Sequence, residues 1–150
     1  NKNFTYTFKE LFGGGTASLS LSDPENILTS GIVILVHPPG KIVVHLDALS
    51  GGEKALVAIA LYFSIMKVRP APFCVMDEIE AALDDVNVYR FASYLRRMTE
   101  KTQFILITHR RGTMEEADVL YGVTMQDEGI SKLLELRSTE VAAKLGIDTK

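Results

Sequence analysis

Two adjacent carboxylates, Asp77 and Glu78, directly follow the apolar run Phe73-Cys74-Val75-Met76. Such a run is typical of a buried strand, and ligands of open α/β sheets bind beyond the carboxyl ends of the strands. There, one carboxylate can hold a hydrated Mg²⁺ while the other accepts a proton from an attacking water or orients it. The pair therefore indicates Mg²⁺-dependent nucleotide hydrolysis, with a solvated strand end as the plain structural alternative.

A second candidate site is the segment Leu49-Ser50-Gly51-Gly52-Glu53, which precedes the apolar run Ala55 to Met66. Ser50 and Glu53 have the spacing of a capping box, which begins a helix, and the glycines let another molecule approach the helix end. The unpaired N–H groups of a first helical turn attract anions. The segment thus predicts an anion site, and the alternative is an ordinary capping box worth about 1 kcal/mol to the helix.

Two further polar side chains lie where they could reach the acidic pair. His109 follows the next predicted core strand, which places its imidazole at the same edge of the sheet and within reach of a terminal phosphate. A lone histidine is nevertheless more often structural. Asp84 lies between the acidic pair and the following helix, and capping that helix is the default role for either Asp84 or Asp85.

The elements that position these residues alternate along the chain from Gly52 onward. We expect helices over about 52–67 and 86–98, and strands over 73–77 and 104–108. This order is typical of a parallel sheet with helical crossovers. Neither strand alternates apolar with polar residues, so we expect helices to cover both faces of the sheet.

The first third of the chain has a different pattern. Phe4, Phe8, Leu11 and Phe12 form an apolar helical stripe that stops at Gly13-Gly14-Gly15, so the chain should open with the end of a helix. Alternating or β-branched runs near 17–21, 32–36 and 41–46 are separated by turn residues, and they predict a β meander.

The last third should close the domain. We expect a short helix near 113–117, strands over 119–125 and 131–136, and a turn at 127–129 between them. The segment 139–145 could be a helix or a frayed tail.

Length and composition bound the alternatives. At 150 residues and 47% hydrophobic, the chain can bury one sizeable core and reads as a single domain. A net charge of -3 argues against a surface built wholly for nucleic acid, and a local basic patch stays open. The single cysteine, Cys74, reads as a core residue. No signal pattern and no apolar run of roughly 20 residues occurs, so we expect a cytoplasmic protein with no membrane partner.

Four short segments occur in the order seen in a known ATPase class. They are Leu49-Ser50-Gly51-Gly52-Glu53, the run ending in Asp77-Glu78, then Ala82-Leu83-Asp84, then Ile107-Thr108-His109. They resemble the ABC signature, Walker B, D-loop and H-loop. The surrounding sequences, Pro72 to Asp84 and His109 to Asp118, closely resemble bacterial SMC heads, and the likeness spans roughly Leu11 to Leu136.

The resemblance implies a fold and a role for each site residue. The fold is α/β, the C-terminal half of an ABC-type ATPase head, with a parallel core sheet and helical crossovers preceded by a β meander. The implied cofactors are ATP and Mg²⁺. By the same resemblance, Ser50, Gly51, Gly52 and Glu53 contact the ATP of the opposite head, Asp77 serves Mg²⁺, Glu78 activates water, Asp84 crosses the dimer interface and His109 senses the γ-phosphate.

A P-loop of the form G-x-x-x-x-G-K-[ST] occurs nowhere in the sequence. In the SMC family that loop belongs to a lobe at the far N-terminus, separated from the C-terminal lobe by a long coiled coil and a hinge. We therefore expect residues 1–15 to end the exit helix of the coiled coil. Residues 16–150 would form one C-terminal head lobe, which hydrolyses ATP only together with the P-loop lobe and a second head.

The resemblance also implies partners and a location. The partners are the N-terminal P-loop lobe, a second SMC head in an ATP-dependent homodimer, a kleisin subunit bound through the strands between 119 and 136, and DNA through the full complex. The location is the cytoplasm, in association with the nucleoid. The alternatives are the head lobe of a related coiled-coil DNA-repair ATPase and a lobe that acts chiefly as a kleisin-docking module. An ABC transporter domain fits less well, because a helical subdomain rather than a β meander precedes its signature.

Overall fold

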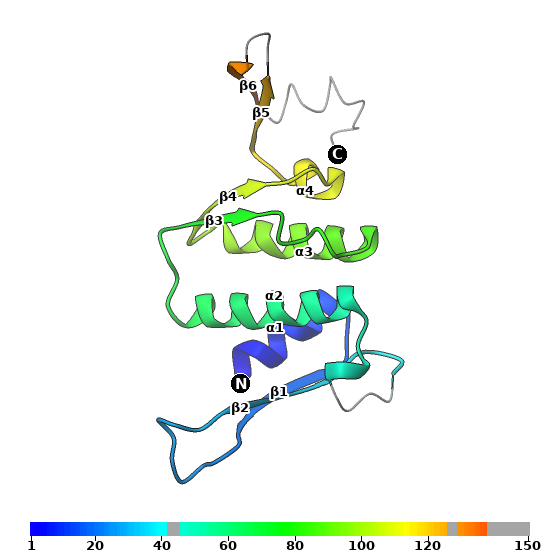
Figure 1. Ribbon diagram of the computed structural model, residues 1–150, viewed down its shortest axis with the longest axis vertical. Helices are drawn as coiled ribbons and strands as arrows, with labels where there is room; N and C mark the ends of the chain where they lie inside the picture. Colours follow the sequence, from blue (N-terminus) through cyan, green and yellow to red (C-terminus); the bar gives the residue numbers. More distant parts are fainter. Residues whose placement is uncertain (42–45, 126–128, 138–150) are drawn as a thin grey trace.

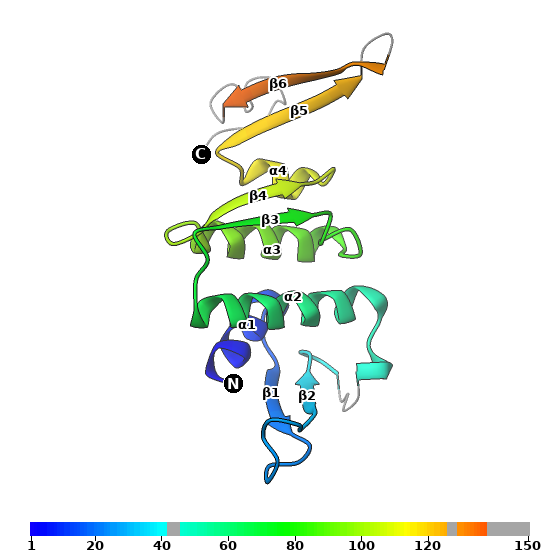
Figure 2. The ribbon, with the colours of Figure 1, turned by 60° about the vertical axis from the view of Figure 1, so that its left-hand side comes forward.

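The computed structural model describes residues 1–41, 46–125 and 129–137 of the chain. Its fold is mixed α/β, as predicted. Figure 1 and Figure 2 show three helices packed at the centre, with the strand pair β1–β2 at one end of the molecule and the pair β5–β6 at the other. The pair β3–β4 lies beside α3, between the helices and β5–β6.

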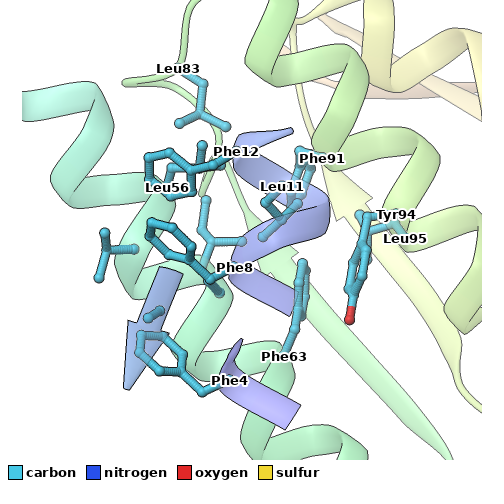
Figure 3. Close-up of a cluster of buried hydrophobic side chains, with 14 of the residues drawn as sticks. Phe4, Phe8, Leu11, Phe12, Leu56, Phe63, Leu83, Phe91, Tyr94 and Leu95 are labelled. Carbon is cyan, nitrogen blue, oxygen red and sulfur yellow. The ribbon is translucent and has the colours of Figure 1, made fainter. Parts of the chain in front are cut away.

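Helix α1 (Lys2–Phe12) buries the apolar stripe that its sequence predicts. The buried residues of the stripe are Phe4, Phe8, Leu11 and Phe12. The helix ends at Gly13, whose φ of 70° lies in the left-handed region that favours glycine. The predicted opening helix is therefore confirmed, and Figure 3 shows its aromatic side chains inside the core.

Helices α2 (Gly51–Val68) and α3 (Asp85–Met98) complete the core. Phe63 of α2 is fully buried, and its ring stacks with those of Phe91 and Tyr94 of α3 at centroid distances of 5.9 and 5.6 Å. Figure 3 shows this aromatic contact beside α1. Because both helices begin at a candidate site loop, the contact also fixes where those loops lie.

The first two strands form part of the predicted meander. β1 (Thr16–Leu21) and β2 (Ile32–His37) pair antiparallel. The third predicted run falls mainly on residues 42–45, which lie outside the described residues. Leu46 begins a short 3-10 helix, η1 (Leu46–Ala48), rather than ending a strand.

The central strands β3 (Phe73–Asp77) and β4 (Gln103–Ile107) pair parallel, with α3 as the crossover between them. This topology is as predicted, although the described residues place only two strands in the parallel pair. The face that carries Cys74 and Met76 joins the helical core.

The expectation that helices cover both faces of this pair is wrong for the described residues. One face is bare: Phe73, Val75, Ile105 and Ile107 are between 48% and 60% exposed. The physical reason is that α3 follows β3 and packs on one face alone, and no other element in the described part of the chain reaches the second face.

The chain ends, as far as it is described, in a hairpin. After α4 (Arg111–Glu115), which begins two residues earlier than predicted, β5 (Val119–Met125) and β6 (Ser131–Arg137) pair antiparallel. Most of the predicted turn at 127–129 and all of 139–145 lie outside the described residues. Among the helices that the structure describes, none has the length and apolarity to cross a membrane.

Candidate functional site

The carboxyl ends of β3 and β4 bring two predicted site residues together. Asp77 is paired in register with Ile107, and the backbone N–H of Glu78 donates to the Ile107 carbonyl at 2.9 Å, which extends the ladder by one residue. One step further, Glu78 Oε1 lies 3.1 Å from His109 Nδ1. The parallel topology therefore places the carboxylate and the imidazole in contact although 31 positions separate them in sequence.

Glu78 sits in an unusual backbone conformation. Its φ is +47°, the one positive φ at a residue other than glycine in the described part of the chain. Such a conformation costs on the order of 1–3 kcal/mol, and it persists only where the surroundings hold it. The turn it makes carries the chain away from the strand while the side chain stays at the strand end, with 52% of its surface exposed. Glu78 is thus free to meet a ligand on one side and His109 on the other.

The exposed carboxylate of Asp77 fits a hard divalent cation. Carboxylate oxygens are ligands that Mg²⁺ prefers, and Mg²⁺ commonly takes one or two of them together with water and phosphate oxygens. Asp77 is the last residue of β3 and is exposed to solvent. Within the described residues no group of three or more His, Cys, Asp or Glu side chains could hold a metal ion. Asp77 would supply one carboxylate ligand to such a cation.

The predicted capping box is present at the start of α2. Ser50 Oγ accepts from the N–H of Glu53 at 3.3 Å, and Glu53 Oε2 accepts from the N–H of Ser50 at 2.9 Å. The second carboxylate oxygen of Glu53 bonds Lys41 Nζ at 2.7 Å. This ammonium, helped by the Ser50 N–H, holds the pKa of Glu53 below its ordinary value. Each oxygen of Glu53 thus has a partner within the chain, and these bonds hold the loop before α2.

The two glycines of the loop have different surroundings. A Cβ at Gly51 would meet nothing within 4 Å, which leaves that position open to a ligand or partner. A Cβ at Gly52 would lie 2.8 Å from the backbone carbonyl oxygen of Ala82. Gly52 therefore lets α2 approach the segment that follows the acidic pair. The loop before α2 and the loop after β3 touch inside one chain, a contact the sequence did not indicate.

Asp84 caps α3, as its default reading predicts. Its side chain accepts from the backbone N–H of Asn87 at 2.9 Å and from the Asn87 amide at 3.0 Å. Asp84 is exposed, so the cap leaves one edge of the carboxylate on the surface. Asp85 does not cap the helix and instead bonds Arg110 at 2.8 Å.

The sequence and its geometry match one protein family. The family model described as "RecF/RecN/SMC N terminal domain" matches residues 28–132, which include every candidate site residue. The chain belongs to the SMC family. Its relatives include the Chromosome partition protein Smc of Bacillus subtilis, 61% identical over 92% of this chain, and that of Mycobacterium tuberculosis, 49% identical over 91%. Both identify it with the bacterial SMC proteins.

These relatives are much longer than the chain. It spans 12% of the length of the Bacillus subtilis protein and 11% of the Mycobacterium tuberculosis protein. Solved SMC heads share its fold. A chain from a study of ATP-driven dimerization and DNA-stimulated activation of SMC ATPases superposes with a TM-score of 0.86 at 42% identity, covering 97% of this chain and 88% of that one. An Smc head bound to the C-winged helix domain of ScpA gives 0.84 at 45%, covering 95% and 43%.

Two residues of this SMC chain that sequence reasoning passed over lie next to the site. Glu80 is 1% exposed and bonds the hydroxyls of Thr108 and Thr113. Arg110 bonds the Leu83 carbonyl and the Asp85 carboxylate. No local pattern in the sequence marks either residue, because each contact joins segments 25 or more positions apart.

Proposed function

We propose that this chain is the C-terminal lobe of an SMC ATPase head, whose hydrolysis of ATP controls head engagement and chromosome organisation. The observation that carries the proposal is the contact between Glu78 and His109 at the meeting ends of two parallel strands. A carboxylate and an imidazole at this edge of an α/β sheet lie where ligands bind in such folds. Membership of the SMC family supports ATP as that ligand.

Each site residue has a task that its surroundings support. Glu78 accepts a proton from the attacking water or orients it, and His109 holds the Glu78 carboxylate from its far side and reaches the terminal phosphate. Asp77 would hold Mg²⁺, which neutralises charge on the phosphates when bound. Asp84 keeps its cap and presents its exposed edge to the opposite head.

The loop before α2 would bind the ATP that the opposite head carries. The N–H groups at the start of α2 favour an anion, and the space around Gly51 leaves room for one. Ser50, Gly51 and Gly52 would approach the γ-phosphate, while Glu53 stabilises their conformation through Ser50 and Lys41. Two heads would therefore share two ATP molecules across a symmetric interface.

The site would be completed by a separate P-loop lobe. The sequence carries no P-loop. In the described part of the chain, the bare face of β3–β4 exposes four apolar side chains to solvent, those of Phe73, Val75, Ile105 and Ile107. An apolar sheet face of this kind is normally covered in the native assembly. We assign residues 1–15 to the end of the coiled-coil exit helix and 16–150 to the head lobe, and we expect the P-loop lobe to cover this face.

The wider partners follow from the same assignment. We propose a second head as an ATP-dependent partner, a kleisin subunit, and DNA through the full complex, in the cytoplasm and associated with the nucleoid. Similar solved heads include one from Pyrococcus furiosus bound to the C-terminal domain of ScpA, at 43% identity with a TM-score of 0.85 and covering 97% of this chain and 36% of that one. This supports a kleisin-binding role for the lobe.

One specific observation favours a docking role in addition to catalysis. The β5–β6 hairpin exposes apolar side chains, with Val123 at 71%, Met125 at 73% and Leu133 at 62%. Exposed apolar groups in one place favour a protein partner. We propose that the kleisin subunit binds here, and that docking does not require the hydrolytic residues.

The test of the proposed function is ATP turnover with Mg²⁺, measured for this chain alone and for the chain combined with its P-loop lobe. We expect no turnover from the chain alone and turnover from the combination. In the combination, Glu78→Gln should abolish hydrolysis while binding of the kleisin subunit survives. Turnover by the chain alone, or loss of both activities in a folded Glu78→Gln variant, would contradict the assignment.

A further inference from the structure

The Glu78–His109 pair is not held in place by its own contacts. Glu78 and His109 are 52% and 63% exposed, and among the described residues the hydrogen bond between them is the one bond that either side chain makes. Catalytic groups act efficiently only when neighbouring residues lock their geometry. The loops that carry them must therefore be fixed by other side chains.

We propose that Arg110 and Glu80, here called the loop clamp, are positioning residues for this site. They hold the loop after β4 against the loop after β3, and so they set both the Glu78–His109 contact and the place of Asp84. The consequence for hydrolysis rests on the proposed function, whereas the structural part does not.

Arg110 forms the outer half of the clamp. Its Nη1 donates to the Leu83 carbonyl at 2.9 Å, and its Nη2 donates to Asp85 Oδ1 at 2.8 Å. These acceptors belong to the two residues that flank Asp84 in the chain, and Arg110 itself follows His109. The planar guanidinium can satisfy two acceptors at once, which a lysine ammonium on a flexible stem does less well. One side chain thus joins the histidine loop to both sides of Asp84.

Glu80 forms the inner half. Its Oε1 accepts from Thr108 Oγ1 at 2.5 Å and from Thr113 Oγ1 at 3.0 Å, and Thr108 Oγ1 accepts in turn from the Arg110 N–H at 3.0 Å. Glu80 thereby fixes the residue before His109, as Arg110 fixes the loop after it. Its Oε2 is buried and has no partner among the described residues. A buried carboxyl group weakens stability unless it is fully paired, so its presence here calls for a functional reason.

The chain offers a matched control for Arg110. The side chain of the next residue, Arg111, donates from Nε to Glu115 Oε1 within α4 at 2.7 Å and makes no other hydrogen bond among the described residues. Its side chain is 67% exposed against 18% for Arg110. Arg110→Ala and Arg111→Ala therefore remove the same charge one position apart, and only the first removes a link between the two loops.

The experiment measures ATP turnover in a head that combines this chain with the P-loop lobe. For Arg110→Ala we expect kcat to fall on the order of 10- to 100-fold with KM nearly unchanged, because misplaced groups lose transition-state contacts rather than substrate binding. Arg111→Ala should keep the parental kcat, and Arg110→Lys should recover part of the loss. Glu80→Leu should lower kcat in the same way, and Glu80→Gln, which keeps an acceptor at Oε1, should recover most of it.

Amide hydrogen exchange supplies a readout that does not depend on hydrolysis. Peptides covering residues 81–85 should exchange faster in Arg110→Ala than in the parental head, and Arg111→Ala should leave them unchanged. Parental kcat and parental exchange in Arg110→Ala would overturn the clamp, and faster exchange with parental kcat would overturn its role in catalysis. A parental head that exchanges as expected but does not hydrolyse ATP would instead contradict the proposed function.

Discussion

Gly52→Ala tests whether the loop before α2 and the loop after β3 are in contact. Neither Gly51 nor Gly52 has a positive φ, so alanine is allowed by the backbone at both positions. The new methyl group at position 52 would lie 2.8 Å from the Ala82 carbonyl oxygen, where ordinary contacts begin at 3.4 Å. The obstacle is backbone rather than a flexible side chain, so α2 or the loop must move by several tenths of an ångström.

The expected magnitude follows from two opposing effects. Forcing a methyl group into a filled space costs about 1–3 kcal/mol. Replacing glycine by alanine in a helix returns up to about 1 kcal/mol. Gly51→Ala receives the second effect without the first, because a Cβ there meets nothing within 4 Å. The difference between the two variants isolates the steric cost, and we expect Gly52→Ala to be less stable than Gly51→Ala by about 1–3 kcal/mol.

The assay is urea unfolding of a head that contains the chain, with the two variants and the parental protein measured side by side. The midpoint should fall for Gly52→Ala and hold or rise for Gly51→Ala, with the slope unchanged. If the two alanine variants unfold with the same free energy within about 0.5 kcal/mol, the Gly52–Ala82 contact does not exist in solution. The glycine pair would then be explained by ligand access alone.

Three further predictions concern the elements around the site. Asp84→Ala should lower the free energy of unfolding by about 1 kcal/mol because α3 loses its cap, whereas Asp84→Asn should keep the parental free energy because asparagine also caps helices. Thermal unfolding measures both variants, and equal losses would argue against capping. Phe63→Ala should cost about 3–5 kcal/mol by emptying the stacked core, and a loss below about 1 kcal/mol in denaturant unfolding would contradict that packing. Because the pKa of Glu53 is lowered in the folded state, its stabilisation should be complete above the ordinary value of 4.5 and lost as pH falls through the lowered value. Glu53→Gln should flatten that acid-side loss, and an unchanged pH profile of unfolding would refute the role of the Lys41 contact.

The contact between Glu78 and His109 could be predicted because it depends on topology alone. Two apolar runs separated by a helix make a parallel pair, and the ends of parallel strands meet at one edge. The predicted strands at 73–77 and 104–108 are enough to place residues 78 and 109 at one edge of the sheet, and the structure pairs 73–77 with 103–107. The helix caps could also be predicted, because Ser50, Glu53 and Asp84 each bond a residue only three positions away in the sequence.

The loop clamp could not be predicted, for a physical reason. Glu80 lies between the acidic pair and α3, where no pattern in the sequence indicates burial, and only the packed fold shows that it is 1% exposed. Arg110 and Arg111 are adjacent cations in the sequence, and the difference between them appears only in the fold, where the Leu83 carbonyl lies beside Arg110. The same limit applied to β3–β4, where apolar runs indicated helices on both faces, whereas one face is bare among the described residues.

The positions of the candidate site loops depend on how the helices pack in the core, although the site residues themselves are largely exposed. α2 begins after Ser50 and α3 begins after Asp84, so the distance between these two loops depends on how the two helices pack against each other. Phe63 of α2 stacks with Phe91 and Tyr94 of α3, and Leu83, which is 3% exposed, packs the second loop into the same cluster. A conservative change in this cluster that shifts α2 against α3 would therefore separate Gly52 from Ala82. Under the proposed function, such a change should weaken ATP-dependent head engagement although it alters none of the residues proposed to contact the nucleotide.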